Sequence, residues 1–288
     1  KVINLSPKSW RVDLALNSID VLLVESAWRG FKGKWQRKIA KYEMDNLDLQ
    51  LNKLITYCRG KKIPSIFWNK EDPVNYERFK HNLHSFDICL TTEETMIPRY
   101  KQNFNNLKDV AIMPFFFQPA LHNPSKGEVS EKVVFCGGLY STEFPDRANR
   151  LKKGIDFIGG ENVVVYDRFN SNNTEWNSIK GVEVAAAFSY NNSKKHYQSG
   201  LAQINVNSFD GSSTMFSRRM LELIACGAHV IDLTAYKGKG DLSQYVTQVS
   251  NKNDMIKAFE VSAPCVEFDY LVELYSAGNF INTLKNYI

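Results

Sequence analysis

The sequence lacks the signals by which membrane spans and metal sites are usually recognised. No hydrophobic run approaches the ~20 residues that a membrane-spanning helix needs. No secretory signal opens the chain, which begins at Lys1 without a methionine and so leaves room for upstream residues. The five histidines form no HExxH pattern, and no DxD pair stands at a predicted strand end. We therefore expect a cytoplasmic protein without metal ligands.

Cysteine pairs are also missing. The five cysteines are scattered without a CxxC motif, and several lie in apolar runs. Free cysteine is often simply buried, so we expect the buried thiols of a cytosolic protein rather than disulfides or metal ligands. These residues are Cys58, Cys89, Cys136, Cys226 and Cys265.

Charge of one sign is not concentrated anywhere in a long tract. The 36 basic and 31 acidic residues give a formal charge of +5, with both signs mixed along the chain. This excess is too small to indicate nucleic acid, and we expect no nucleic-acid partner. It suits a phosphorylated or polyanionic ligand, or peripheral contact with the inner face of an anionic membrane.

What the sequence does contain is a regular alternation of apolar strands and amphipathic stretches. This pattern is typical of βα units around parallel sheets, and 288 residues suffice for two domains. A polar, proline-containing segment at residues 117–129 divides the halves. We assign residues 1–120 to a first domain, 121–265 to a second, and 266–288 to a helical tail that packs back on the first.

The expected elements follow from periodicity and from glycine and proline breaks. Strands are predicted at residues 20–25, 64–68, 86–91, 109–113, 132–136, 162–166, 202–207, 228–233 and 246–250. Helices are predicted at residues 33–59, 145–157, 192–200, 216–226 and 253–261. Ligands bind beyond the carboxyl ends of parallel strands, so two facing sheets create one cleft where chemistry is expected.

The richest passage is residues 204–231, INVNSFDGSSTMFSRRMLELIACGAHVI. A strand ends at Asn207 and Ser208, and a helix is expected to begin near Met215 or Phe216, capped by a residue of 212–214. A helix N-terminus favours a phosphate. Arg218 and Arg219 in its first turn stand where the helix dipole prefers acids, which indicates an anionic ligand.

Glu222 lies four residues after Arg218. Its carboxylate could accept two hydrogen bonds from the hydroxyls of a ribose or another sugar. The alternative is an i,i+4 ion pair on a solvated helix, worth only a few tenths of a kcal/mol. Spacing alone favours neither interpretation.

FSRRMLELIACGAHVI at residues 216–231 resembles the donor-site motif of group-1 glycosyltransferases, in particular the branch of CgeB-like spore-maturation proteins. Residues 133–151 and 165–168 share this resemblance, which therefore covers most of the second half. Upstream, DVLLVESAWRGFKGKW and IPSIFWNKEDPVNYERF look similar to the acceptor-side domain of that branch. The resemblance implies an α/β protein of GT-B fold, with two Rossmann-like domains whose parallel sheets face each other across a cleft.

The same resemblance implies a bacterial hexosyltransferase of polysaccharide biosynthesis. Its donor would be a nucleoside-diphosphate sugar, UDP-linked, its acceptor a carbohydrate or lipid-linked glycan, and it would use no cofactor. Many retaining members carry two glutamates with seven residues between them. Counting back from Glu222, Thr214 replaces the first of them, which leaves the ribose contact in place and puts retention of configuration in doubt.

Further donor contacts are expected at strand ends. A backbone without a Cβ can approach a ligand closely at Gly137 and Gly138, although such a pair is more often only a turn. Arg147 could reach the diphosphate or be a surface residue. Tyr166, Asp167 and Arg168 could read a nucleobase, or the last two could form an internal ion pair. The complete set of donor-binding candidates is Gly137, Gly138, Arg147, Tyr166, Asp167, Arg168, Asn207, Ser208, Thr214, Met215, Phe216, Ser217, Arg218, Arg219 and Glu222.

The catalytic candidates lie in the first half. An inverting transferase needs a carboxylate or histidine as general base, and Glu25, Glu71 and Asp72 follow predicted strands. Asp72, before a proline, could instead shape a turn. Two other functions remain open: a nucleotide-sugar epimerase or hydrolase of the same fold, and a non-catalytic sugar-nucleotide-binding module of a polymer-assembly protein.

Overall fold

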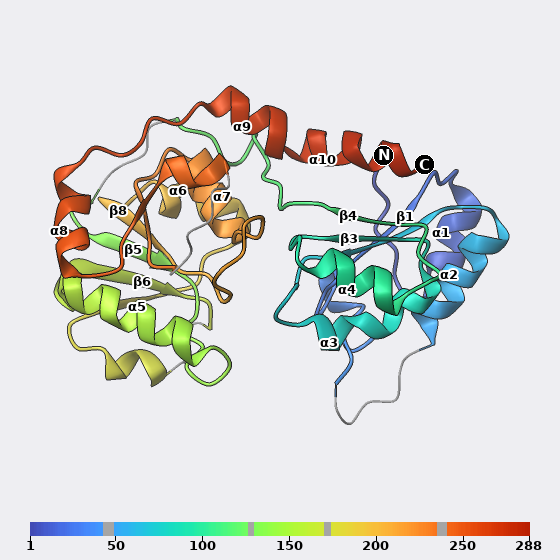
Figure 1. Cartoon of the computed structure of the whole chain (residues 1–288), viewed down its shortest axis with the longest axis horizontal. Coiled ribbons are helices and arrows are strands. Elements are labelled where there is room, and N and C mark those ends of the chain that lie inside the picture. Colours follow the sequence, from blue (N-terminus) through green and yellow to red (C-terminus); the bar gives the residue numbers. More distant parts are fainter. Residues whose placement is uncertain (43–48, 126–129, 170–173, 235–240) are drawn as a thin grey trace. The chain divides into compact units, whose positions relative to one another are not determined.

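The computed structural model describes residues 1–42, 49–125, 130–169, 174–234 and 241–288. The chain divides into two compact units (Figure 1). The first unit comprises Lys1–Pro114 and Ile281–Ile288, and the second comprises Phe115–Phe280. The roles predicted for the two domains, acceptor binding and donor binding, stay predictions.

The first unit contains a four-stranded parallel sheet in the order β1-β2-β3-β4. All five residues of β2 are buried, as expected of a central parallel strand between two helical layers. The strands are β1 (Leu22–Glu25), β2 (Ser65–Asn69), β3 (Ile88–Thr91) and β4 (Asp109–Ile112). The helices are α1 (Trp10–Leu16), α2 (Gln50–Gly60), α3 (Tyr76–Phe79) and α4 (Met96–Asn103).

The second unit contains a six-stranded parallel sheet in the order β10-β9-β8-β5-β6-β7. The strands are β5 (Val133–Cys136), β6 (Val163–Asp167), β7 (Glu183–Ala186), β8 (Ala202–Asn205), β9 (Val230–Asp232) and β10 (Val246–Gln248). The chain runs outward from β5 to β7, then returns to place β8 beside β5. The order therefore reverses between β5 and β8, which is the topological switch point where doubly wound sheets bind ligands.

Helices cover both faces of this sheet (Figure 1). On one face, α5 (Pro145–Ile158) and α8 (Lys252–Glu260) pack on Phe135, Val165 and Ile204. On the other face, α6 (Ser193–Tyr197), α7 (Arg218–Ala225) and α9 (Phe268–Tyr275) share a second core with Val134 and Val230. The chain ends with α10 (Ala277–Leu284) and a short turn, Lys285–Tyr287.

The nine predicted strands are all present, with ends that differ by at most two residues. A tenth, β7, was not predicted: it lies at the sheet edge, and its four residues are at most half buried, so its apolar signal is weak. The helices predicted after residue 145 are also present, and the last of them begins at Lys252.

The predicted helix at residues 33–59 is wrong over its first part. Phe31–Gly33 forms one 3-10 turn, and α2 begins only at Gln50. Residues 31–42 place Trp35 and Ile39 in the core without helical geometry, with positive φ angles at Lys32, Gly33 and Arg37, and residues 43–48 of the predicted helix lie outside the described part. Apolar residues at helix-like spacing were thus buried by an irregular loop.

Two smaller expectations also change. Phe117 and His122 are fully buried, so the described part of the predicted linker packs on the second unit, and residues 126–129 lie outside the described part. Four cysteines are buried and free as predicted, but Cys265 is exposed.

Gly154 shows how tightly α5 packs on the sheet. A Cβ at this position would lie 2.3 Å from Leu233 Cδ1, a buried side chain. We expect Gly154→Ala to lower the free energy of unfolding by about 1–3 kcal/mol because the core would be overpacked. Gly278→Ala is the matched control, since its Cβ would meet only Ser276 Oγ at 3.5 Å. Urea denaturation should show a lower free energy of unfolding for Gly154→Ala but not for Gly278→Ala. Equal free energies of unfolding for the two variants would contradict the packing argument.

Candidate functional site

Arg219 joins the carboxyl ends of the two strands at the switch point. Its Nη1 donates a hydrogen bond to the Cys136 carbonyl at the end of β5, at 2.6 Å, and its Nη2 donates to Asn205 Oδ1 at the end of β8, at 3.2 Å. The guanidinium also lies 4.9 Å from the centre of the Phe135 ring. Burial lowers the pKa of Arg219 from its ordinary value. A cation is therefore fixed where this fold binds ligands.

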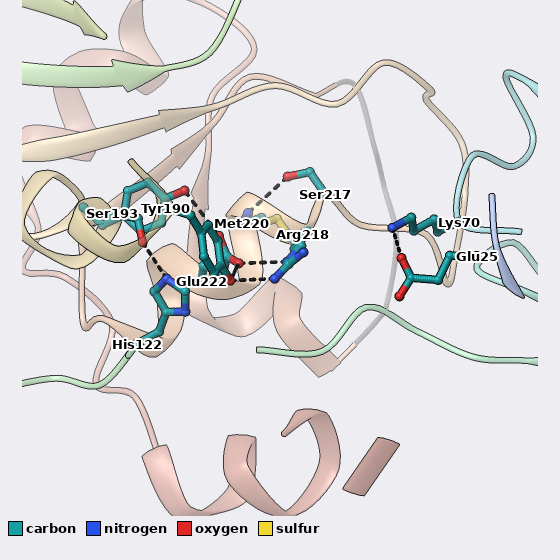
Figure 2. Close-up of polar contacts among 10 residues, drawn as sticks. Glu25, Lys70, His122, Tyr190, Ser193, Ser217, Arg218, Met220 and Glu222 are labelled. Carbon is teal, nitrogen blue, oxygen red and sulfur yellow. Dashed lines mark hydrogen bonds and ion pairs between the residues drawn. The ribbon is translucent and has the colours of Figure 1, made fainter. Parts of the chain in front are cut away.

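The helix α7 begins later than predicted. Ser217 is its N-cap: its Oγ accepts a hydrogen bond from the Met220 N–H at 3.1 Å, so Arg218 and Arg219 occupy the first two helical positions (Figure 2). Ser212, one of the predicted caps, instead accepts from the Thr214 and Met215 N–H groups in the preceding loop. The first turn of α7 contains no acidic residue.

A buried polar network supports this helix start. Asn205 Oδ1 accepts from Ser217 Oγ at 2.9 Å, and Asn205 Nδ2 contacts both Asn207 and Asp232. Thr234 donates to Asp232 Oδ1 through its hydroxyl and its N–H. Burial raises the pKa of Asp232, which the hydrogen bonds from Thr234 oppose. The side chains of Asn205 and Asn207 thus hold the loop ends and Arg219 together, as buried polar groups require partners.

Glu222 is buried rather than solvated, with 2% of its surface exposed. Its Oε1 accepts from Arg218 Nε at 2.9 Å and from the Tyr190 hydroxyl at 2.6 Å, and its Oε2 accepts from the Tyr197 hydroxyl at 3.2 Å. Arg218 also donates to Tyr190 (Figure 2). The i,i+4 pair is present, but it belongs to a buried cluster and not to a solvated helix face.

His122 forms the second layer of this cluster. The ring lies against Tyr190 and Tyr197, with centroid distances of 5.5 and 5.9 Å, and its Nε2 contacts Ser193 Oγ at 2.8 Å. Burial lowers the pKa of His122, so the ring is neutral at neutral pH. Its position fixes the two tyrosines that hydrogen-bond Glu222.

The loop after β5 lies directly against Arg219. A Cβ on Gly137 would meet Arg219 Nη1 at 2.7 Å, so this glycine permits the close approach. Arg147 is buried, not a surface residue, and its Nη1 donates to the Gly138 and Leu139 carbonyls at 3.0 Å. Burial lowers the pKa of Arg147 to about 9, which still leaves it charged at neutral pH. Arg147 thus holds the loop after β5 in place. The sequence had suggested that it would reach past this loop to the diphosphate.

Several polar atoms at this edge of the sheet are buried without a hydrogen-bond partner among the described residues. They are Ser141 Oγ, Arg150 Nε, Asp210 Oδ1, Arg219 Nε and both carboxylate oxygens of Asp167. Arg150 and Asp210 pair with each other at 2.6 Å through their other atoms. Unsatisfied buried polar groups are rare in native proteins, and a missing ligand is one explanation for a cluster of them.

The remaining donor candidates are dispersed along the same edge. Tyr166 packs edge-on against Phe188 and His196. Asp167, at the end of β6, is fully buried, whereas Arg168 is exposed and donates to the Tyr140 hydroxyl at 3.2 Å. In the described part of the chain these two residues form no ion pair with each other. Ser208 is exposed, and Phe216 packs against Tyr275.

In the first unit, the three catalytic candidates have different environments. Glu25 ends β1 and forms an ion pair with Lys70, with 41% of its side chain exposed (Figure 2). Glu71 accepts from Asn75 Nδ2 at 2.9 Å. Asp72 is 2% exposed and accepts a hydrogen bond from Asn69 Nδ2. Two further hydrogen bonds to Asp72 are described below with its pKa. Glu25 is thus partly exposed, whereas Asp72 is buried.

Sequence reasoning missed Tyr190, Tyr197, His122 and Arg150. Arg150 could have been found, because it follows Arg147 by three residues on the same face of α5. The tyrosines lie about 30 residues before Glu222 in an unremarkable stretch, and only the fold brings them to it.

The described residues contain no group of three His, Cys, Asp or Glu side chains placed to hold a metal ion. Within the same residues, no helix is long and apolar enough to cross a membrane.

Asp72 should make stability depend on pH. Thr91 and Tyr100 each donate to its Oδ2 at 2.6 Å, but burial prevails and raises its pKa to about 7. Between pH 4 and 7 the folded state therefore holds a proton that the unfolded state has released. We expect the free energy of unfolding to fall as pH rises through this range, by a few kcal/mol at most, since one pKa unit is about 1.4 kcal/mol.

Urea denaturation from pH 4 to 8 tests this expectation. Asp72→Asn should flatten the decline between pH 4 and 7, while Glu71→Gln, on the neighbouring and more exposed residue, should leave it unchanged. An identical pH profile in wild type and Asp72→Asn would show that the carboxyl group of Asp72 is ionised throughout.

The chain has no match among protein-family models and none among curated protein sequences. It is similar to solved structures. An α-glucosyltransferase in complex with UDP and a 13-mer DNA containing a HMU base has a TM-score of 0.57 and 10% identity, over 98% of this chain and 83% of that one. A T4 phage BGT mutant with UDP-glucose has a TM-score of 0.54 and 12% identity, over 96% and 84%.

Sucrose-phosphate synthase from Thermosynechococcus elongatus gives a TM-score of 0.52 and 13% identity, over 88% of this chain and 82% of that one. Likenesses at this level of identity establish a fold. With its parallel sheets of four and six strands, the chain has the GT-B fold, built from two Rossmann-like domains.

Proposed function

We propose that the chain is a glycosyltransferase, of the CgeB-like group-1 branch, that transfers a sugar from a nucleoside-diphosphate sugar to a bacterial surface glycan. The observation that carries this proposal is the start of α7 at the switch point, where Arg218 and Arg219 replace the acids that the helix dipole favours. Free backbone N–H groups and two arginines together form a binding site for a diphosphate.

The geometry supports this role for each arginine differently. Arg219 is held by Cys136 and Asn205 through its two terminal nitrogens, while its buried Nε has no partner among the described residues. Arg218 keeps 43% of its side chain exposed, although it also contacts Glu222. One cation is therefore preorganised and the other accessible. Preorganised charge is the main source of stabilisation for a developing anion.

A UDP-linked donor is the best-supported class. Two of the similar structures are named as complexes with UDP or UDP-glucose. In our proposal Glu222 accepts the ribose hydroxyls. Because Tyr190 and Arg218 now occupy Glu222 Oε1, the ribose would replace the Tyr190 hydroxyl, which is a like-for-like exchange of hydrogen bonds.

For catalysis we propose Glu25 as the general base that removes the proton of the acceptor hydroxyl. The acceptor oxygen then attacks the anomeric carbon of the donor sugar. The bond between that carbon and the diphosphate breaks, and UDP leaves with the negative charge. Glu25 is at the carboxyl end of β1 and partly exposed, which a base that meets an acceptor requires. Thr214 in place of the first glutamate of that motif is consistent with inversion. No metal ion takes part in this proposal, because arginines and the helix N-terminus supply the positive charge.

Donor binding is the first test. UDP at 100 times its dissociation constant should stabilise the fold by about 2.7 kcal/mol, measured as a thermal shift in EDTA. Arg218→Ala and Glu222→Gln should abolish most of the shift, whereas Lys153→Ala, which removes an exposed charge from α5, should keep it.

Because one T4 phage BGT structure is named with UDP and Mn2+, the same shift is measured with added Mn2+. A shift that appears only with Mn2+ would contradict the metal-free mechanism, and no shift with any nucleoside diphosphate would contradict the donor site.

The base is tested by turnover. Glu25→Gln should lower the rate of sugar transfer about 100- to 10,000-fold, the usual contribution of a general base, while the UDP-induced shift stays unchanged. Glu71→Gln, an isosteric change beside the neighbouring strand, should keep most activity. Product analysis should show glycosylated acceptor; free sugar or an epimer alone would favour a hydrolase or epimerase, and donor binding without consumption a binding module.

A further inference from the structure

We infer that the loop after β1, residues 29–41, binds an acceptor that is a flexible phosphodiester-linked polymer; this inference rests on the proposed function and specifies its acceptor. The starting observation is charge. From Ser26 to Tyr42 the chain has six lysines and arginines and no acidic residue, and acids return only at Glu43. The first unit has 20 basic and 13 acidic residues, whereas the second has 16 and 18.

The loop lies at the carboxyl edge of the first sheet, because it follows Glu25, the last residue of β1. Arg29, Lys32, Lys34 and Lys41 are exposed, and among the described residues none of them pairs with a carboxylate. Some other cations of this unit are paired: Lys80 and Arg99 both contact Glu77. The loop therefore presents a local excess of unneutralised positive charge next to the proposed base.

The loop has a fixed conformation. Trp35 is 7% exposed and donates from its indole N–H to the Leu5 carbonyl at 2.8 Å, and its backbone N–H donates to the Arg29 carbonyl at 3.0 Å. Gly30 permits this fold, since a Cβ there would lie 2.7 Å from Trp35 Cβ.

The far end of the loop is anchored as well. Asn82 donates to the Ile39 carbonyl at 2.8 Å, and the Lys41 N–H donates to the Arg78 carbonyl at 2.8 Å. A cationic surface that is already ordered loses little entropy when a ligand binds.

The shape of the loop favours a flexible polymer over two other anionic partners. Reading duplex DNA usually takes a helix or a two-stranded ribbon in a groove, and the described loop has only the turn Phe31–Gly33. A membrane surface calls for a larger apolar face. Phe31 is the one large apolar side chain exposed in this loop, at 45%, and Lys32 Nζ lies 5.4 Å from its ring centre. A chain with one negative charge per repeat can instead follow the cations around the loop.

The experiment uses the whole chain and labelled poly(glycerol phosphate) as the probe, without donor, at 50 and 200 mM salt. Lys32→Ala/Lys34→Ala should weaken binding about tenfold or more and lower the slope of log affinity against log salt by about 1.4, because two phosphate contacts are lost and each contributes about 0.7 on a single-stranded polyanion. Lys61→Ala/Lys62→Ala is the control. It removes the same charge from exposed positions just before β2, away from the loop, and should bind like wild type.

Equal weakening in both double variants would overturn the inference, because only net charge would then matter. Tighter binding to a duplex DNA 20-mer, or to phosphatidylglycerol vesicles, than to poly(glycerol phosphate) would also overturn it. The UDP thermal shift is measured on the same variants. A normal shift with no polymer binding rejects the inference alone, whereas polymer binding with no shift rejects the donor site and leaves the loop in place.

Discussion

The contact of Arg219 with the ends of β5 and β8 is the interaction on which the second unit's site depends. It holds together two strands that are separated by about 65 residues of chain, at the point where the strand order reverses. A buried cation is costly unless it is paired or hydrogen-bonded. Here the carbonyl of Cys136 and the amide oxygen of Asn205 supply the bonds, so Gly137, Asn205 and the start of α7 must all keep their places.

A second constraint is the satisfaction of Glu222 inside the protein. Arg218, Tyr190 and Tyr197 occupy its oxygens, and His122 packs behind the tyrosines. This arrangement satisfies a buried carboxylate with hydrogen bonds whose donors are charged or polarised by their neighbours. In the proposed function, a ribose hydroxyl would take the place of a tyrosine hydroxyl on Glu222 at little cost.

In the first unit, burial separates carboxylates that look alike in the sequence. Asp72 and Glu25 both follow strands of one sheet, but Asp72 lies in the core with Thr91 and Tyr100, whereas Glu25 faces Lys70 at the surface. Desolvation makes the first a structural group whose proton affinity affects stability. The second is partly exposed, and in our proposal it meets the acceptor, which the ordered cationic loop that follows it would bring to that position.

The sequence by itself determined the α/β class, the parallel sheets and the arginines of α7, because these depend on local periodicity and on which residues follow apolar strands. It could not determine the start of α2, since Trp35 and Ile39 have helix-like spacing in the sequence but are buried in an irregular loop. Nor could it identify Ser217 as the N-cap of α7, Arg147 as a hydrogen-bond donor to the loop after β5, or Tyr190 as a hydrogen-bond partner of Glu222. Those positions depend on contacts between residues far apart in the chain, which only tertiary packing decides.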